Sequence, residues 1–141
     1  MKRSAEAKWQ GSITEGSGDI KTESGAFEGK YSFSSRFGDD RKATNPEELI
    51  AGALAACYSM ALTGAAGKAG FTPKSVDTKA YVTIEKQEAG FHIPKIDLET
   101  QASIDGIDED AFQKLAEETK KTCPVSKVLA GAEISLTASL I

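Results

Sequence analysis

Few residues in this sequence are of the kind that bind metals or form compact redox motifs. Its 141 residues contain one histidine, His92, and two cysteines, Cys57 and Cys123. A zinc site as a rule needs four sulfur or imidazole ligands, so these three residues are too few. The cysteines lie far apart in the chain, which excludes a Cys-x-x-Cys motif. We therefore expect no metal site and no cofactor.

Blocks of positive charge are also missing. The formal net charge is −4, from 17 basic and 21 acidic residues scattered along the chain. The pair Lys120–Lys121 is too short to form a nucleic-acid-binding surface. Only three arginines occur, namely Arg3, Arg36 and Arg41. We therefore expect no nucleic-acid partner.

The N-terminus shows no targeting segment. Residues 1–6 carry charge and lack the apolar stretch of a signal peptide. Residues 49–67 are uncharged and long enough to cross a bilayer, but alanine and glycine dominate them and make insertion marginal. We expect a cytoplasmic protein without a membrane span, in which this segment is a helix buried within protein. In a reducing compartment, two cysteines are more often catalytic, redox-active or inert than a structural disulfide.

The order of the expected elements predicts an α+β fold in a single domain over residues 1–141. Alternating apolar and polar residues and glycine-rich turns predict the strands. These strands cover residues 8–10, 19–22, 30–33, 79–85, 96–104 and 133–141, with a polar loop at 36–41 and a hairpin turn at 87–90. Strands, a long helix, further strands, a second helix and a last strand thus follow one another along the chain.

Two helices are predicted from their end signals. Asn45 is suited to cap a helix that starts at Pro46, and two acidic residues follow where the helix dipole favours them. This apolar helix runs to about Gly70. A second helix starts near Asp108 and ends before Pro124.

The long apolar helix also predicts a homodimer. It needs cover on every side, but one modest sheet covers a helix from one side only. The small residues Ala51, Gly52, Ala55 and Ala56 would let a second copy approach closely. The alternative is that the sheet and the second helix of one chain suffice.

The cysteines differ in their expected surroundings. If Pro124 begins a helix, Cys123 caps it, and such a position stabilises a thiolate. Cys57 lies inside the apolar helix, so its pKa is expected to be raised unless a cation reaches it. From spacing alone, both cysteines are just as readily inert core residues. A catalytic pair of a cysteine with His92 is a weak alternative.

Arg36 is the candidate cation, because it stands between the aromatic residues Phe33 and Phe37 and keeps its charge when partly buried. A partly buried arginine needs a carboxylate. The nearest acidic residues in the sequence are Glu47, Glu48, Asp39 and Asp40.

Five motifs follow one another along nearly the whole chain. They are Ser35-Arg36-Phe37, Thr44-Asn45-Pro46-Glu47-Glu48-Leu49-Ile50, Ala55-Ala56-Cys57-Tyr58-Ser59-Met60-Ala61-Leu62, Gly70-Phe71-Thr72-Pro73 and Cys123-Pro124-Val125-Ser126-Lys127-Val128-Leu129. Together they resemble the OsmC branch of the OsmC/Ohr hydroperoxide reductases. One departure is Leu54, where the family often has histidine.

The resemblance implies an intertwined homodimer, with long central helices flanked by antiparallel sheets. It implies a thiol peroxidase of oxidative and osmotic stress defence that reduces alkyl or lipid hydroperoxides and is restored by a lipoyl-type or similar dithiol. Cys57 would be the attacking cysteine and Cys123 its disulfide partner. Arg36 and Glu47 would activate Cys57, in this family from the partner chain. The rival functions are a non-catalytic dimeric binding module and a thiol redox sensor.

Overall fold

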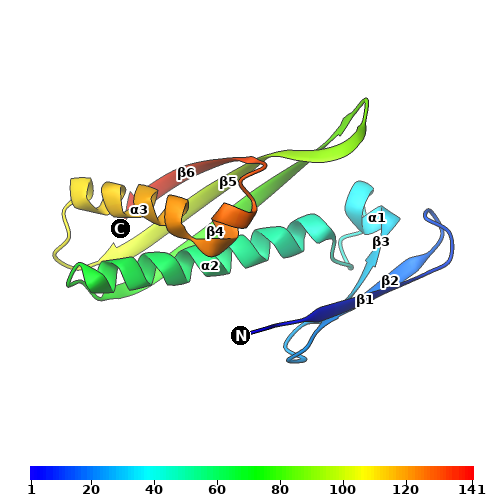
Figure 1. The fold of residues 1–141 in the computed structure, drawn as a ribbon, viewed down its shortest axis with the longest axis horizontal. Coiled ribbons are helices and arrows are strands. Elements are labelled where there is room, and N and C mark those ends of the chain that lie inside the picture. The colour runs from blue at the N-terminus through cyan, green and yellow to red at the C-terminus, as the bar shows by residue number, and fades with distance from the viewer. The chain divides into compact units, whose positions relative to one another are not determined.

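The computed structural model describes residues 1–141, and the chain divides into two compact units, residues 1–49 and 50–141. Figure 1 shows the elements of both units and labels most of them. The elements confirm the α+β composition. The expectation that residues 1–141 form one domain stays a prediction.

The first unit contains a three-stranded antiparallel sheet in the order β1-β2-β3. Its strands are β1 (Ala5–Gln10), β2 (Ser17–Thr22) and β3 (Glu28–Ser32). Glycine allows the turn after β1, because Gly11 has a φ of 91°, which residues with a side chain rarely adopt. The three strands contain the predicted segments, except that Phe33, which was predicted to lie in the third strand, begins a helix.

A short helix, α1 (Phe33–Phe37), follows β3 directly. The predicted polar loop at 36–41 is therefore wrong for its first two residues. Two reciprocal hydrogen bonds form a capping box: the Ser35 amide donates to Ser32 Oγ over 3.0 Å, and the Ser32 amide donates to Ser35 Oγ over 2.8 Å. This box fixes the start of the turn that carries Arg36.

The long helix α2 (Pro46–Lys68) starts as predicted and ends two residues earlier than predicted. Asn45 Oδ1 accepts a 2.9 Å hydrogen bond from the Glu48 amide, and Asn45 Nδ2 donates to the Ser35 carbonyl over 3.0 Å. Asn45 therefore caps α2 and at the same time holds the end of α1.

The second unit contains a three-stranded sheet in the order β4-β5-β6. The strands β4 (Pro73–Gln87) and β5 (Gly90–Ile104) form the predicted antiparallel hairpin, with Gln87 opposite Gly90. The last strand, β6 (Glu133–Leu140), pairs with β5 in parallel. The expectation of purely antiparallel sheets is therefore wrong for this pair.

The reason is the crossover between β5 and β6. The helices α3 (Glu109–Thr122) and α4 (Pro124–Val128) lie between these strands in the chain. They carry the chain back along the sheet, so that β6 starts again beside Lys95 near the beginning of β5 (Figure 1). Asp108 caps α3 by accepting a 2.9 Å hydrogen bond from the Ala111 amide.

The core of the second unit lies between this sheet and the helices. Leu54, Tyr58, Leu62 and Ala66 recur every fourth residue of α2 and are fully buried. They meet the inward side chains of β5 and Phe112 of α3. The buried residues of β5 are Ile96, Leu98, Thr100, Ala102 and Ile104.

The opposite side of α2 is not covered by the sheet and helices of the second unit. Its exposed residues are apolar or small, and Met60 is 76% exposed. The exposed positions include Gly52, Ala53, Ala56, Thr63 and Gly64. By length and composition α2 could cross a membrane, but a single such helix is a weak indication, because the core helix of a soluble protein has the same properties.

Candidate active site

The structure brings the two cysteines into contact. Cys57, in the middle of α2, is partly buried, and Cys123, between α3 and α4, is fully buried. Their Sγ atoms lie 2.9 Å apart and share a hydrogen bond, and both are free thiols. A disulfide bond is about 2.05 Å long. The two sulfurs can therefore bond after a movement of about 1 Å.

The two thiols differ in how readily they lose a proton. Burial raises the pKa of Cys57, the hydrogen bond with Cys123 raises it further, and the Val125 amide lowers it in part. Burial also opposes ionisation of Cys123. The hydrogen bond with Cys57, the amides of Ser126 and Val125 and the nearby Ser126 hydroxyl outweigh burial and lower the pKa of Cys123. Within this unit the negative charge is favoured on Cys123, as its place before Pro124 indicates.

Local hydrogen bonds hold Cys123 in place. Its amide donates to the Thr119 carbonyl over 2.9 Å, and its carbonyl accepts from the Lys127 amide over 3.1 Å. The buried Tyr58 hydroxyl donates to the Ala116 carbonyl over 3.0 Å and so ties α2 to α3. Burial raises the pKa of Tyr58, and Glu117 and Cys123 raise it further, so this hydroxyl keeps its proton.

The first unit contains the second pair of predicted residues. Arg36 Nη2 donates to Glu47 Oε1 over 2.7 Å, and Arg36 Nε lies 3.1 and 3.2 Å from the two carboxylate oxygens. The Glu47 side chain is 9% exposed and that of Arg36 is 37% exposed. The guanidinium carbon lies 5.1 Å from the centre of the Phe37 ring. Glu47 thus holds one edge of the guanidinium, and Arg36 Nη1 makes none of these bonds.

The other polar candidates have different partners. Glu48 accepts a hydrogen bond from the Thr44 hydroxyl, and Asp40 accepts one from the Lys42 amide. His92 bonds to Gln87 in the β4–β5 hairpin, with 2.9 Å between their Nε2 atoms. Of the four acidic residues near Arg36 in sequence, Glu47 is the one that binds it.

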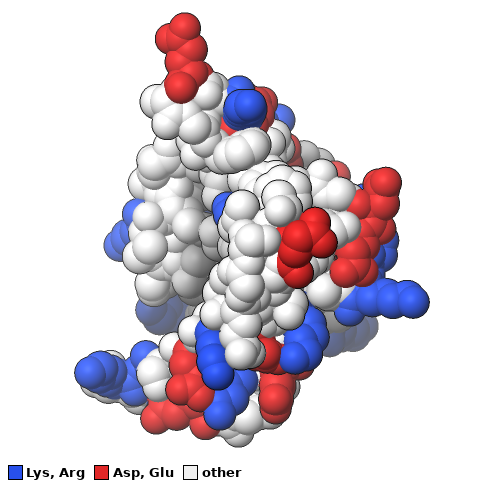
Figure 2. Space-filling view, turned by 90° about the vertical axis from the view of Figure 1, so that its right-hand side faces the viewer, with Lys and Arg blue, Asp and Glu red and all other residues white.

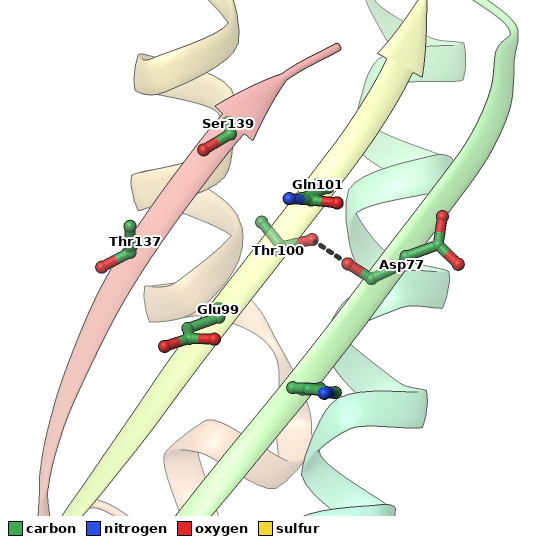
Figure 3. A pocket seen from close by; sticks show the side chains of 7 residues that line it. Asp77, Glu99, Thr100, Gln101, Thr137 and Ser139 are labelled. Carbon is green, nitrogen blue, oxygen red and sulfur yellow. Dashed lines mark hydrogen bonds between the residues drawn. The ribbon is translucent and has the colours of Figure 1, made fainter.

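The side of the β4-β5-β6 sheet away from the helices carries a shallow hollow, shown in Figure 3 with the helices behind the strands. Its labelled residues are Asp77, Glu99, Thr100, Gln101, Thr137 and Ser139. Neither cysteine lines it, and acidic and hydroxyl side chains predominate. In Figure 2, acidic and basic side chains are interspersed around a broad uncharged area, and neither sign forms a continuous patch on the face drawn. The hollow is therefore a solvated sheet face rather than part of the thiol site.

Residues 38–139 match the family of OsmC-like proteins. The chain belongs to the OsmC-like family. It is 47% identical over 135 residues to a protein named peroxiredoxin OsmC from Escherichia coli (strain K12). The aligned residues cover 95% of this chain and 93% of that protein. The same identity and coverage hold for a protein of that name from Shigella flexneri. The resemblance seen in the motifs is confirmed.

Solved structures of the OsmC-like family agree with the fold. An organic hydroperoxide resistance protein OsmC from Legionella pneumophila superposes with a TM-score of 0.71 at 25% identity, covering 97% of this chain and 96% of that one. A putative organic hydroperoxide resistance protein from Vibrio cholerae, with captopril bound in one of its active sites, has a TM-score of 0.74 at 25% identity over 97% of this chain and 90% of that one.

Ser126 is a residue of this site to which the sequence assigned no role. It is 5% exposed, and its hydroxyl makes no hydrogen bond. Its position three residues after a capping cysteine was a signal, because the third residue of a helix faces the cap.

Proposed function

We propose that this OsmC-like protein is a thiol peroxidase that reduces organic hydroperoxides to alcohols. Cys57 is the attacking thiolate and Cys123 its disulfide partner. The observation that carries the proposal is the 2.9 Å separation of the two sulfurs in a chain whose curated relatives are named peroxiredoxin. The relatives of known structure named for organic hydroperoxide resistance support the substrate class.

The reaction proceeds in three steps. The Cys57 thiolate attacks the terminal peroxide oxygen, the O–O bond breaks, and the alkoxide takes up a proton and leaves as an alcohol. Cys57 is now a sulfenic acid. The Cys123 thiolate attacks its sulfur, hydroxide leaves and is protonated to water, and a disulfide forms. An external dithiol, of the lipoyl type or similar, then restores both thiols by exchange and becomes oxidised itself.

Cys57 needs a positive charge that its own surroundings do not provide, because they raise its pKa. Arg36, oriented by Glu47, supplies this charge. We assign this activating pair to the partner chain of a homodimer, as the resemblance implies.

The exposed side of α2 supports this homodimer. A side-chain carbon built at Gly52 or Gly64 would have no neighbour within 4 Å, so neither glycine is required by the packing of one chain. Both leave room for a second helix. The exposed side of α2 is apolar. Such a surface is costly to leave in water and is typical of an interface between subunits.

Met60→Glu tests the homodimer. A charge at a side chain that is 76% exposed costs a single chain little, but it disrupts a packed interface. We expect light scattering at micromolar concentration to show a dimer for the unaltered protein and a monomer for the variant. The control is Ile13→Glu, at an apolar side chain that is 68% exposed in the first unit, which should stay dimeric. A monomeric unaltered protein would contradict the proposal.

The peroxidase activity is tested by measuring turnover of cumene hydroperoxide and of hydrogen peroxide with a dithiol reductant. We expect faster turnover of cumene hydroperoxide, because the neighbours of Cys57 are apolar, and none in Cys57→Ser. Unchanged turnover in that variant would overturn the proposal. Disulfide formation without turnover would instead indicate a redox sensor, and unreactive thiols would indicate a binding module.

A cytoplasmic location is part of the proposal, since it keeps dithiol reductants available.

A further inference from the structure

The hydroxyl of Ser126 is a buried polar group without a hydrogen-bond partner, and no other buried side-chain oxygen or nitrogen in the chain shares this property. Burying a hydroxyl without a partner costs free energy, and such groups are rare in folded proteins. Ser126 lies on α4, one turn after Cys123. An unpaired hydroxyl next to a reactive sulfur calls for a functional explanation.

The geometry of the turn limits what this hydroxyl can bind. Cys123 precedes the first residue of α4, so Ser126 is the third residue of the helix. In a capping box the third residue binds the amide of the cap. Here the Cys123 amide already donates to the Thr119 carbonyl over 2.9 Å. The Cys123 side chain is the remaining group of the cap for the Ser126 hydroxyl to bind.

We propose that Ser126 is a positioning residue for the disulfide-forming step: its hydroxyl donates a hydrogen bond to Cys123 Sγ once that sulfur carries a negative charge. A thiolate accepts hydrogen bonds far better than a thiol, so the unpaired hydroxyl gains a partner when Cys123 ionises. The same hydroxyl is among the groups that lower the pKa of Cys123. The inference rests on the proposed function in one respect, namely that Cys123 attacks the sulfenic acid of Cys57.

The hydrogen bond acts on the attack without taking part in the bonds that change. The Cys123 sulfur gives its electron pair to the Cys57 sulfur, hydroxide leaves Cys57, and the Ser126 proton stays on its oxygen. A donor to the thiolate raises the fraction ionised near neutral pH and directs the sulfur. It also makes the thiolate a weaker nucleophile, because nucleophilicity falls as the pKa of a thiol falls.

The first test is the ionisation of Cys123 in the Cys57→Ser background, followed by thiolate absorbance in the ultraviolet. We expect the additional change Ser126→Ala to raise the pKa of Cys123 by about one unit. The ionisable groups that bear on Cys123 are Cys57, which this background removes, and Tyr58 of α2, beside Glu117 of α3. Tyr58 ionises only at higher pH and does not overlap with the measurement.

Three comparisons separate this role from a structural one. Ser126→Thr keeps the hydroxyl and should keep the lowered pKa. Thr122→Ala is the matched control, because the Thr122 hydroxyl donates to the Glu118 carbonyl and not to sulfur, and it should leave the pKa unchanged. Ser126→Ala should not lower the melting temperature of the reduced protein, since the lost hydroxyl has no partner there. A lower melting temperature with an unchanged pKa would overturn the proposal.

The second test is the rate of disulfide formation after one equivalent of cumene hydroperoxide, measured by rapid quenching and mass spectrometry. Below the pKa of Cys123, Ser126→Ala should slow the step by about threefold, because a tenfold loss of thiolate is partly offset by higher nucleophilicity. Above the pKa, the variant should be faster by about threefold. Equal slowing at every pH would contradict the proposal. The ionisation test needs no peroxide, so its result stands even if the protein proves not to be a peroxidase.

Discussion

The two units each hold one pair of interacting side chains, and the pairs differ in burial and charge. In the second unit, the sulfurs of two free cysteines meet at 2.9 Å, with Cys123 fully buried. In the first unit, Arg36 and Glu47 meet at 2.7 Å as full charges, with the guanidinium partly exposed. The buried pair can form a bond but lacks a charge to ionise Cys57. The ion pair has that charge but no nucleophile.

The difference indicates a division of labour. A sulfur that is shielded from water reacts with the peroxide and is protected from side reactions, but shielding also raises its pKa. In the proposed dimer, a cation held by a carboxylate of one chain can reach such a sulfur in the other chain. The chain that contains the sulfur then does not have to bury a cation of its own. Removing one member of a pair at a time separates the two roles, and the expected loss is largest in the thiol pair and smallest at the carboxylate.

The largest effect is expected within the thiol pair. Cys123→Ser should still react with one equivalent of cumene hydroperoxide but should lose dithiol-dependent turnover, because the Cys57 sulfenic acid has no neighbour to form a disulfide with. Excess peroxide should oxidise Cys57 further to the sulfinic acid, which intact-mass spectrometry detects. Normal turnover with free Cys57 would show that the 2.9 Å contact has no role in the cycle.

A smaller effect is expected from the cation of the ion pair. Arg36→Ala should slow the reaction of Cys57 with peroxide by about ten- to a hundredfold, because a hydrogen bond to a charged group contributes about 1.5–3 kcal/mol. The pKa of Cys57 should rise, so the rate of the variant should keep increasing at pH values where the unaltered protein has reached its plateau. Arg36→Lys should restore part of the rate, since lysine lacks the planar fork.

Arg41→Ala is the control for that measurement. Arg41 lies in the exposed segment before α2, and we expect its loss to leave the thiolate absorbance profile unchanged. A shift of the profile in Arg41→Ala together with no shift in Arg36→Ala would show that Arg36 is not the activating arginine.

The smallest effect is expected from the carboxylate. Glu47→Ala should act in the same direction as Arg36→Ala but by a smaller factor, because Glu47 orients the guanidinium and does not touch the sulfur. Glu48→Ala should do less still, since Glu48 binds the Thr44 hydroxyl. Steady-state rates for the three variants over a range of pH check this order. A larger loss in Glu48→Ala than in Glu47→Ala would contradict it.

Local signals made parts of the fold predictable from the sequence. The start of α2 was readable because Asn45 and Pro46 act over a few residues, and the hairpin between β4 and β5 because its strands alternate strictly. The helix α1 was missed because it has only five residues, although Ser32 and Ser35 carried the spacing of a capping box. The direction of β6 was missed because it depends on the crossover between strands rather than on the strand itself.

The site was predictable to a similar degree. Spacing alone left four carboxylates open for Arg36, and the family resemblance selected Glu47, which the geometry pairs with it. The contact of Cys57 with Cys123 came from the same source, because residues this far apart in the chain meet only through tertiary packing. The spacing of Ser126 from Cys123 was a signal, but its burial and its lack of a partner are properties of the folded chain and could not be read from the sequence.

The separation of the two cysteines in sequence also makes the protein's resistance to unfolding depend on its redox state. They are 66 positions apart, so the proposed disulfide closes a loop that spans almost half of the chain. By restricting the unfolded chain, a cross-link of that span stabilises a fold by about 4 kcal/mol in the chain-entropy account. The oxidised intermediate should therefore melt at a higher temperature than the reduced protein, and Cys123→Ser should lose the difference. Each catalytic cycle would then take the protein through a more and a less heat-resistant form, and its melting temperature would report how much of it is waiting for reductant.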